Sequence, residues 1–446
     1  MLDKFTEFLD TKLSTPMAKL AEQRHLRAVR DGIVASLPLI IVGSFFLIVA
    51  FPPLPEAWGI TQFLKANAGT ILLPYRMTFF IISIYSTFGI GYSLSKSYKL
   101  DGLTGGILAT ATFLLTIVPT AIGGLTPDLL EIVEKSPELL AWYNSVPQGW
   151  QMPMGNLGGG SMFVAIITSI IGVEIYRLIN KSKFKITMPD AVPTSVARSF
   201  EALTPAAVIV VVMAVVTYFL GFDWHGFVAK LVAPLVSATD TLPSVIILIF
   251  LITFFWSFGI HGVSIIGSLA RPLWIQLLDA NTAAYAAGQT VPGIAAEPFF
   301  QWFIWVGGSG ATIGLAILLA FRAKSAYAKS LGKATIVPAI FNINEPIIFG
   351  APIVLNPILI IPFVVAPIIM GTVSWFAMSA DLVSKVVVTA PWTLPGPIGA
   401  YLATGGDWRA SVLNIICIII SIVVYYPFVK MYDKKLLQEE SGEQIA

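Results

Sequence analysis

The chain has 446 residues, of which 56% are hydrophobic and only 12% are charged, and its formal net charge is +2. Soluble globular proteins carry about 25% charged residues, which cover the surface that faces water. This composition excludes a soluble globular domain and predicts an all-α, polytopic membrane protein. The small net charge gives no sign of a nucleic-acid partner. A single cysteine, Cys417, excludes an intramolecular disulfide and a thiolate metal cluster.

Nine apolar stretches approach the length of about 20 residues that a membrane span needs. They lie at roughly 32–51, 77–95, 102–121, 158–178, 203–222, 243–260, 298–321, 353–378 and 410–429. Between the fourth and fifth stretches, segment 188–205 repeats apolar residues at helical spacing. This spacing predicts an amphipathic helix that lies in the membrane interface.

Lys and Arg in the short loops set the expected orientation. Positive residues crowd the first 30 positions, segments 177–201 and 322–333, and the tail after Phe428, whereas segment 122–157 is acidic. We therefore expect both termini on the cytoplasmic side and segment 122–157 outside. This assignment needs a tenth crossing within 261–297. Because that segment is broken by Gly, Pro and charges, we expect a hairpin or interrupted helix buried in protein.

The two halves of the chain, 1–222 and 223–446, differ in pattern. The first half alternates long apolar runs with charged loops. In the second half, segments 336–357 and 390–406 are apolar but punctuated by Pro and Gly. Paired interrupted segments of this kind indicate a solute site near the membrane midplane, because unwound backbone exposes polar groups to a ligand.

Two ionisable residues are candidates for the solute site. Glu345 lies in an apolar stretch between Asn344 and Pro346, with no cation within ten residues. Such a group is costly within a membrane and is a functional candidate for that reason. His261 lies between Gly259 and Gly262, which allow close approach of a ligand to the backbone.

Tryptophans of the second half add a third feature. Trp256 precedes His261 by five residues, and Trp392 lies within the interrupted segment 390–406. Aromatic faces stack on the C–H faces of sugars, while carboxylate, amide and imidazole groups bind hydroxyls. The combination indicates a carbohydrate. No P-loop motif GxxxxGK[ST] is present, so ATP hydrolysis by that route is excluded.

Four segments carry a resemblance to a known family: RDGIVASLPLIIVGSFF (30–46), VPTSVARSFEALTP (192–205), SFGIHG (257–262) and FNINEPIIFGAPIVLNP (341–357). They resemble the EIIC membrane subunit of the bacterial phosphotransferase system, in its lactose/cellobiose/diacetylchitobiose branch. The resemblance runs over nearly the whole chain. Its most specific motif is the Asn-Glu-Pro of 344–346, followed by Gly-x-His-Gly.

The resemblance implies a homodimer in the bacterial cytoplasmic membrane, with about ten spans and two re-entrant hairpins per protomer. The hairpins are expected after His261 and around Glu345. The first half forms the dimer contact, and the second half holds the sugar and moves like an elevator. The expected substrate is a β-linked disaccharide, of the diacetylchitobiose or cellobiose type rather than lactose. No cofactor or metal is implied.

The resemblance also implies chemistry. A separate cytoplasmic subunit, EIIB, donates a phosphoryl group from its phosphocysteine to the sugar's 6-hydroxyl. Glu345 is expected to contact this hydroxyl as general base, His261 to orient it, and Asn344 to bind a neighbouring hydroxyl. Trp256 and Trp392 are expected to contact the sugar rings.

Two other functions remain open on the sequence. An ion-coupled secondary sugar transporter would use Glu345 as a proton relay, and its transport would depend on a membrane gradient. An intramembrane enzyme acting on a lipid-linked substrate would use the pair of Glu345 and His261. The second is disfavoured because no basic cluster suits a diphosphate.

Overall fold

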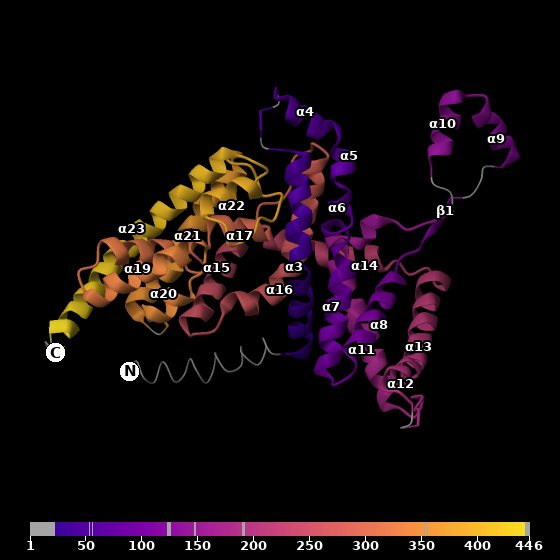
Figure 1. Cartoon of the computed structure of the whole chain (residues 1–446), viewed down its shortest axis with the longest axis horizontal. Coiled ribbons are helices and arrows are strands. Elements are labelled where there is room, and N and C mark those ends of the chain that lie inside the picture. The colour runs from indigo at the N-terminus through magenta and orange to yellow at the C-terminus, as the bar shows by residue number, and fades with distance from the viewer. Residues whose placement is uncertain are drawn as a thin grey trace.

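A computed structural model describes residues 23–441 except 53, 56, 123–125, 147–148, 190–191, 352 and 355. Its architecture is helical, and the strands in the described part are a single antiparallel pair, β1 (Thr120–Ile122) and β2 (Gly149–Gln151). Figure 1 shows the helices of the first half standing side by side, with the second half lying against α3. The first 22 residues, where several of the expected cytoplasmic charges lie, are outside the described range.

The first half is built on four long helices: α3 (Arg24–Ala50), α7 (Ile82–Ser97), α8 (Gly102–Leu114) and α11 (Met162–Lys181). Small residues let these helices pack closely, as apolar association in a membrane requires. A Cβ atom on Gly32 of α3 would lie 2.3 Å from the backbone nitrogen of Ile90 on α7. A Cβ atom on Gly91 of α7 would lie 2.6 Å from the carbonyl oxygen of Gly105 on α8.

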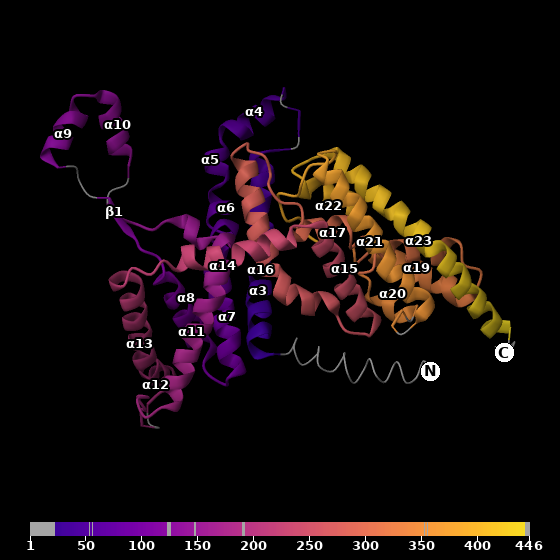
Figure 2. The same ribbon diagram turned by 180° about the vertical axis from the view of Figure 1, so that it is seen from behind.

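Short elements extend from both ends of this bundle. At one end lie α4 (Gly59–Ala66), α5 (Ala68–Ile71), α6 (Leu73–Arg76) and the 3-10 turn Phe79–Ile81. At the same end the β1–β2 ribbon carries α9 (Pro127–Glu134) and α10 (Pro137–Ser145) away from the body (Figures 1 and 2). Helix α12 (Thr194–Glu201) lies at the other end, which agrees with the predicted placement of 122–157 and 177–201 on opposite sides.

The expected amphipathic segment is helical over α12, and the following span is α13 (Leu203–Ala214), continued by a π-helical turn, Val215–Phe219. An additional helix, α14 (Trp224–Thr239), is missing from the predicted spans. Its Val228 and Val232 are buried in one cluster with Phe113 of α8 and Val164 of α11. Helix α14 thus packs on the first half, although it follows the predicted boundary at 222.

The second half begins with α15 (Leu242–Ser257), which is bent by 80° relative to α14. It continues through helices of very different length, from six residues in the shortest to 34 in the longest. These are α16 (Gly262–Ala286), α17 (Glu297–Phe303), α18 (Ile313–Phe321), α19 (Ala326–Ile340), α20 (Glu345–Gly350), α21 (Pro357–Ser379), α22 (Gly396–Ala403) and α23 (Trp408–Ser441). The 3-10 turns Met154–Leu157 and Gly159–Ser161 precede α11 in the first half.

The prediction of an interrupted helix directly after His261 was wrong, whereas the alternative of a re-entrant hairpin over 261–297 stays a prediction. Helix α16 runs for 25 residues through Pro272, and at 1.5 Å per residue it is about 37 Å long. The two charges that suggested a loop are satisfied from other elements. Arg271 pairs with Glu297 at 2.8 Å, and Asp279 accepts a hydrogen bond of 3.2 Å from the backbone N–H of Gly160.

The prediction of one continuous span over 298–321 was also wrong. Helix α17 ends at Phe303 and α18 starts at Ile313. Between them Gly307, Gly308 and Gly310 all have positive φ, at 82°, 93° and 85°. Glycine tolerates this conformation, whereas a helix cannot continue through it. The apolar neighbours concealed the break from a count of hydrophobic residues.

By length and composition, six helices in the described part of the chain could cross a membrane, or seven if α14 and α15 count as one bent span. The fold is therefore that of a multi-pass membrane protein. Several helices of the second half, such as α17 and α18, are too short to be counted because breaks divide the apolar stretches. Segment 336–357 is interrupted as predicted, by the turn between α19 and α20 and by the stretch between α20 and α21.

Candidate substrate site between the two halves

A cavity of about 570 Å³ lies between α3 of the first half and three parts of the second half: α16, α17 and the irregular segment 389–392. Its wall combines aromatic rings with polar and charged groups. The lining residues are Arg30, Asp31, Val34, Leu37, Ile41, His261, Val263, Ser264, Arg271, Trp274, Glu297, Pro298, Phe300, Gln301, Trp302, Trp305, Thr389, Ala390 and Trp392. The volume falls within the range of about 300–1,000 Å³ that small-molecule sites occupy.

His261 lies on the cavity wall at the N-cap of α16. Its Nδ1 accepts a hydrogen bond of 3.2 Å from the backbone N–H of Ser264, and the Oγ of Ser264 lies 3.0 Å from the same nitrogen. Because a backbone N–H can only donate, Nδ1 carries no proton when the imidazole is neutral. The proton is then on Nε2, so His261 presents a hydrogen-bond donor to a ligand.

The two tryptophans singled out from the sequence have different surroundings. Trp392 lines the cavity and is 50% exposed, so its face is available to a ligand. Trp256 is only 3% exposed and is not part of the lining. Its ring centroid lies 4.5 Å from that of His261. In this conformation Trp256 therefore supports the imidazole from behind.

Glu345 begins α20 and is exposed, and it lies beyond the cavity lining. Its carboxylate nevertheless interacts electrostatically with His261, as does Arg30 of α3. Asn344, the N-cap residue of α20, is buried, and its Nδ2 donates a hydrogen bond of 2.9 Å to the carbonyl oxygen of Ser309. The structure thus joins Asn344 to the glycine-rich break, and neither Asn344 nor Glu345 lines the cavity.

The sequence reasoning missed the ion pair of Arg271 and Glu297. Both residues line the cavity, and Nε and Nη2 of Arg271 lie 3.1 Å and 2.8 Å from one oxygen of Glu297. A signal was present in the sequence. Glu297–Pro298 repeats the Glu-Pro pair of Glu345–Pro346, and in both cases the pair opens a short helix. A carboxylate is favoured at this position by the helix dipole.

Asn342 holds the irregular backbone beside the cavity in place. Its Oδ1 accepts from the N–H of Gly307 at 2.9 Å, and its Nδ2 donates to the carbonyl oxygens of Trp392 and Leu394 at 2.8 Å and 3.0 Å. The side chain therefore joins the break between α17 and α18 to the segment that carries Trp392. Buried backbone polar groups need such partners when no helix satisfies them.

Side chains of helix α16 make hydrogen bonds to the backbone of two irregular segments, around Gly293 and around Val386. The amide Nδ2 of Asn281 donates to the carbonyl oxygens of Gly293 and Val386, at 2.8 Å and 2.9 Å. The hydroxyl of Thr282 donates to the carbonyl oxygen of Val387 at 2.6 Å. Non-helical backbone is thus placed inside the protein with its hydrogen bonds made, which is the condition for its presence at membrane depth.

Neither a thiol nor a metal cluster contributes to this site in the described part of the chain. Cys417 is fully buried and packs against Ser374, with the sulfur 3.4 Å from the hydroxyl oxygen. No group of three or more His, Cys, Asp or Glu residues with metal-binding geometry is found among the described residues.

Comparisons with known proteins agree with this arrangement. Residues 30–367 match the sequence family described as phosphotransferase system, EIIC. The chain is 39% identical over 452 residues to the cellobiose-specific EIIC component of Geobacillus stearothermophilus, covering 99% of this chain and 97% of that protein. It is 37% identical over 458 residues to the lichenan permease IIC component of Bacillus subtilis (strain 168), covering 100% and 97%.

A solved structure shows a similar fold. It is that of the transporter ChbC, the IIC component from the N,N'-diacetylchitobiose-specific phosphotransferase system. The TM-score is 0.87 at 36% sequence identity, and the alignment covers 98% of this chain and 100% of ChbC. The similarity therefore includes both halves and the segments around the cavity.

Proposed function

Because the chain belongs to the EIIC family of the phosphotransferase system, whose members are its membrane-spanning sugar transporters, we propose that it carries a β-linked disaccharide of the cellobiose or diacetylchitobiose type. The observation that carries this proposal is the cavity between α3 and α16. It offers the half-exposed face of Trp392 beside His261 and Gln301, and the buried Trp302 and Trp305 complete its aromatic wall. Flat faces for sugar rings next to hydrogen-bonding groups for hydroxyls are what a disaccharide requires.

The proposed chemistry is transfer of a phosphoryl group to the 6-hydroxyl of the bound sugar. The hydroxyl oxygen attacks the phosphorus of an EIIB phosphocysteine, the sulfur–phosphorus bond breaks, and the cysteine leaves as a thiolate. Glu345 takes the hydroxyl proton, and Nε2–H of His261 donates to the hydroxyl oxygen and orients it. The hydrogen bond that leaves the Nε2 proton of His261 free for a ligand supports the role of His261, and the charge of Glu345 acts on the same imidazole.

Three neighbours complete the proposed site. Trp392 stacks on a sugar ring, and Trp256 positions His261 from behind. Asn344 binds a hydroxyl through its Oδ1, since its Nδ2 is engaged by Ser309. The phosphocysteine belongs to a separate EIIB subunit, a role for which the buried Cys417 is unsuited.

Transport is proposed to occur by an elevator-like movement of the second half against the first, which would form the contact of a homodimer. Two observations support this division. The cavity lies where α3 faces the second half, and irregular backbone is concentrated in the moving part. Because α14 packs on the first half, we place the boundary between the moving and static parts after α14 rather than at residue 222.

Equilibrium binding of labelled cellobiose, diacetylchitobiose and lactose to the purified protein tests the substrate class. Saturable binding of one β-linked disaccharide, displaced by unlabelled ligand and independent of a membrane gradient, is the expected result. A folded protein that binds none of the three sugars would contradict the proposal. Sugar uptake driven by an ion gradient without EIIB would instead support the ion-coupled alternative.

A further inference from the structure

A second, strongly basic pocket of about 420 Å³ lies where α3 begins and where α7 and α11 end. Its cations are Arg24, Lys99, Arg177 and Lys181, and we call this set the basic pocket. Ser97 and Asn180 add polar side chains to its wall, and no Asp or Glu is among its lining residues. It shares no lining residue with the cavity between the two halves. Two segments that the charge pattern places on the cytoplasmic side, the N-terminal one and 177–201, thus meet here.

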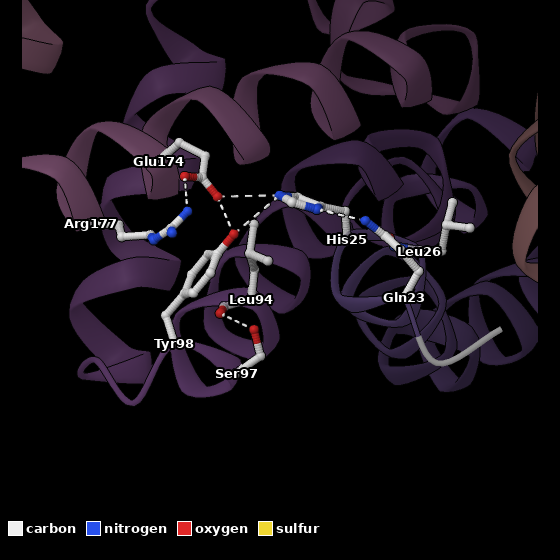
Figure 3. A network of polar contacts seen from close by, with 8 residues as sticks. All are labelled: Gln23, His25, Leu26, Leu94, Ser97, Tyr98, Glu174 and Arg177. Carbon is white, nitrogen blue, oxygen red and sulfur yellow. Dashed lines mark hydrogen bonds and ion pairs between the residues drawn. The ribbon is translucent and has the colours of Figure 1, made fainter. Parts of the chain in front are cut away.

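A network of polar contacts around Glu174 includes Arg177 of the pocket (Figure 3), and Tyr98 of this network also contacts Arg24. Glu174 of α11 accepts hydrogen bonds from Arg177, at 2.8 Å, and from the hydroxyl of Tyr98. His25 lies 3.2 Å from the same carboxylate. The guanidinium carbons of Arg24 and Arg177 lie over the ring of Tyr98, 4.4 Å and 4.2 Å from its centroid. These cation–π contacts fix both groups before any ligand arrives.

Among the residues that the structure describes, neighbouring acids do not balance the charge in this region. Glu174 forms an ion pair with Arg177, which is one of the four cations of the basic pocket. An adjoining pocket shares Lys99, Leu100 and Asn180 with it. There the acids are already taken, because Asp101 pairs with Arg198 and Glu201 pairs with Lys185, each at 3.1 Å. The excess positive charge is therefore concentrated in the basic pocket.

Lys99 supplies an independent observation. It follows α7 at φ 62°, in the left-handed conformation that glycine usually occupies after a helix. The N–H of Leu100 donates to Ser95 and that of Lys99 donates to Lys96, each at 3.0 Å, so the turn is a complete Schellman motif. A lysine is strained in this position relative to glycine. A lysine at a position that suits glycine is explained if its positive charge has a function that outweighs the backbone strain.

We propose that the basic pocket binds a phosphate oxyanion, the chemistry shared by anionic phospholipid headgroups and soluble phosphate esters. Basic pockets between transmembrane helices on the cytoplasmic side suit lipid headgroups. Exposed apolar side chains lie nearby: Leu178, next to Arg177 on α11, is 64% exposed, and Leu103 of α8, which lines the adjoining pocket, is 59% exposed. They offer a surface for acyl chains, and this favours a lipid as the source of the phosphate.

Native mass spectrometry of the purified full-length protein tests this site with dioleoylphosphatidylglycerol as the probe. The test variant is Lys99→Gly combined with Lys181→Gln. Lys99→Gly removes the charge and relieves the strained turn, so loss of folding does not explain a loss of lipid. Lys135→Gln, at the end of the exposed helix α9, is the control, because it removes a lysine charge outside the pocket, compared with the two that the test variant removes. Dioleoylphosphatidylcholine serves as the comparison lipid without net charge, and glycerol 3-phosphate serves as the soluble phosphate ester that competes for the site.

We expect phosphatidylglycerol to remain bound to the wild type and to the control at least fivefold more than phosphatidylcholine, and we expect the double variant to lose this preference. If glycerol 3-phosphate displaces the lipid at millimolar concentration, the site takes a soluble phosphate ester as well. Equal retention of both lipids by the wild type, or an unchanged preference in the double variant, would overturn the proposal. Binding of disaccharide should be unaffected in the double variant, so this test does not depend on the proposed transport function.

Discussion

The two halves use transmembrane helices in opposite ways. In the first half, α3, α7 and α11 run without a break at their centres, and polar networks such as that of His25 and Glu174 lie at helix ends. The second half also has unbroken helices, but α17 and α20 stop within apolar stretches, and Asn342 and Asn281 bond backbone groups of the irregular segments. Uninterrupted helices make a rigid scaffold, whereas interrupted ones bring polar groups to a ligand. The cavity lies where the two kinds of structure meet.

The largest effect is expected from Glu345→Gln, which removes a proton acceptor and retains the shape of the side chain. Phosphorylation of the sugar should fall by about 10²-fold or more, the usual size of a general-base contribution, while sugar binding is retained. The measurement is the rate of sugar phosphate formation with EIIB supplied. Glu134→Gln on the exposed helix α9 is the control. Near-normal phosphorylation in Glu345→Gln would exclude the base role.

Asn342→Ala tests whether the stability of the second half depends on the hydrogen bonds from this side chain to the irregular backbone. The change removes three hydrogen bonds at a residue with φ 60°, a conformation that asparagine tolerates better than alanine. We expect the free energy of unfolding to fall by about 2–3 kcal/mol, because buried backbone groups lose their partners. Thermal unfolding in detergent measures this loss, with Asn67→Ala beside the exposed helix α4 as control. An equal, small loss in both variants would contradict the linking role of Asn342.

Much of this architecture could be predicted from the sequence, but only where hydrophobic length was the controlling property. The spans around α3, α11, α21 and α23 fell at the predicted positions, and the Gly-Pro punctuation marked segment 336–357 as interrupted. Continuity of α16 could not be predicted, since it depends on partners distant in sequence for Arg271 and Asp279. The three glycines within 298–321 indicate a break in the helix, but a prediction based on the number of apolar residues overlooks them.

The same limit applies to the site. His261 and Trp392 were recognised because their neighbours are unusual in sequence, and both line the cavity. Glu297 was missed because its significance comes from Arg271, 26 residues before it along the chain. Trp256 was expected at the sugar, yet its burial behind His261 is a property of packing that no local pattern encodes.

The pair of Arg271 and Glu297 offers a test of intermediate size. The side chains are only 14% and 30% exposed, so removing one partner leaves a charge poorly solvated. We expect Arg271→Gln to weaken disaccharide binding by about tenfold, which corresponds to about 1.4 kcal/mol. The double variant Arg271→Gln with Glu297→Gln should bind better than Arg271→Gln alone, since it leaves no unpaired charge. Additive losses in a double-mutant cycle would contradict this coupling.

The smallest effect is expected in the first half, at the N-cap of α8. The N–H of Thr104 donates to Asp101 at 2.8 Å and, together with Arg198, lowers the pKa of this carboxyl below its ordinary value. A lowered pKa in the folded state adds stability that is complete above the ordinary value of about 3.9 and is lost as the pH falls below it.

Asp101→Asn keeps the cap but not the charge. We expect it to lower the free energy of unfolding by about 0.5–1 kcal/mol at pH 7, the size of a partly exposed pair. The difference between wild type and variant should shrink when thermal unfolding is repeated near pH 3.5. A difference independent of pH would show that the charge of Asp101 does not contribute.

The central claim, that the disaccharide occupies the cavity between the two halves, is tested most directly by substrate protection of a single introduced thiol. Thr389→Cys places the thiol on the cavity wall, and the native Cys417 is buried and should react little with a maleimide. Ser145→Cys on exposed α10 reports general reactivity. We predict that saturating cellobiose or diacetylchitobiose slows labelling of Thr389→Cys several-fold and leaves Ser145→Cys unchanged. Labelling of Thr389→Cys at the same rate with and without a sugar that the protein binds would contradict the assignment of this cavity as the transport site.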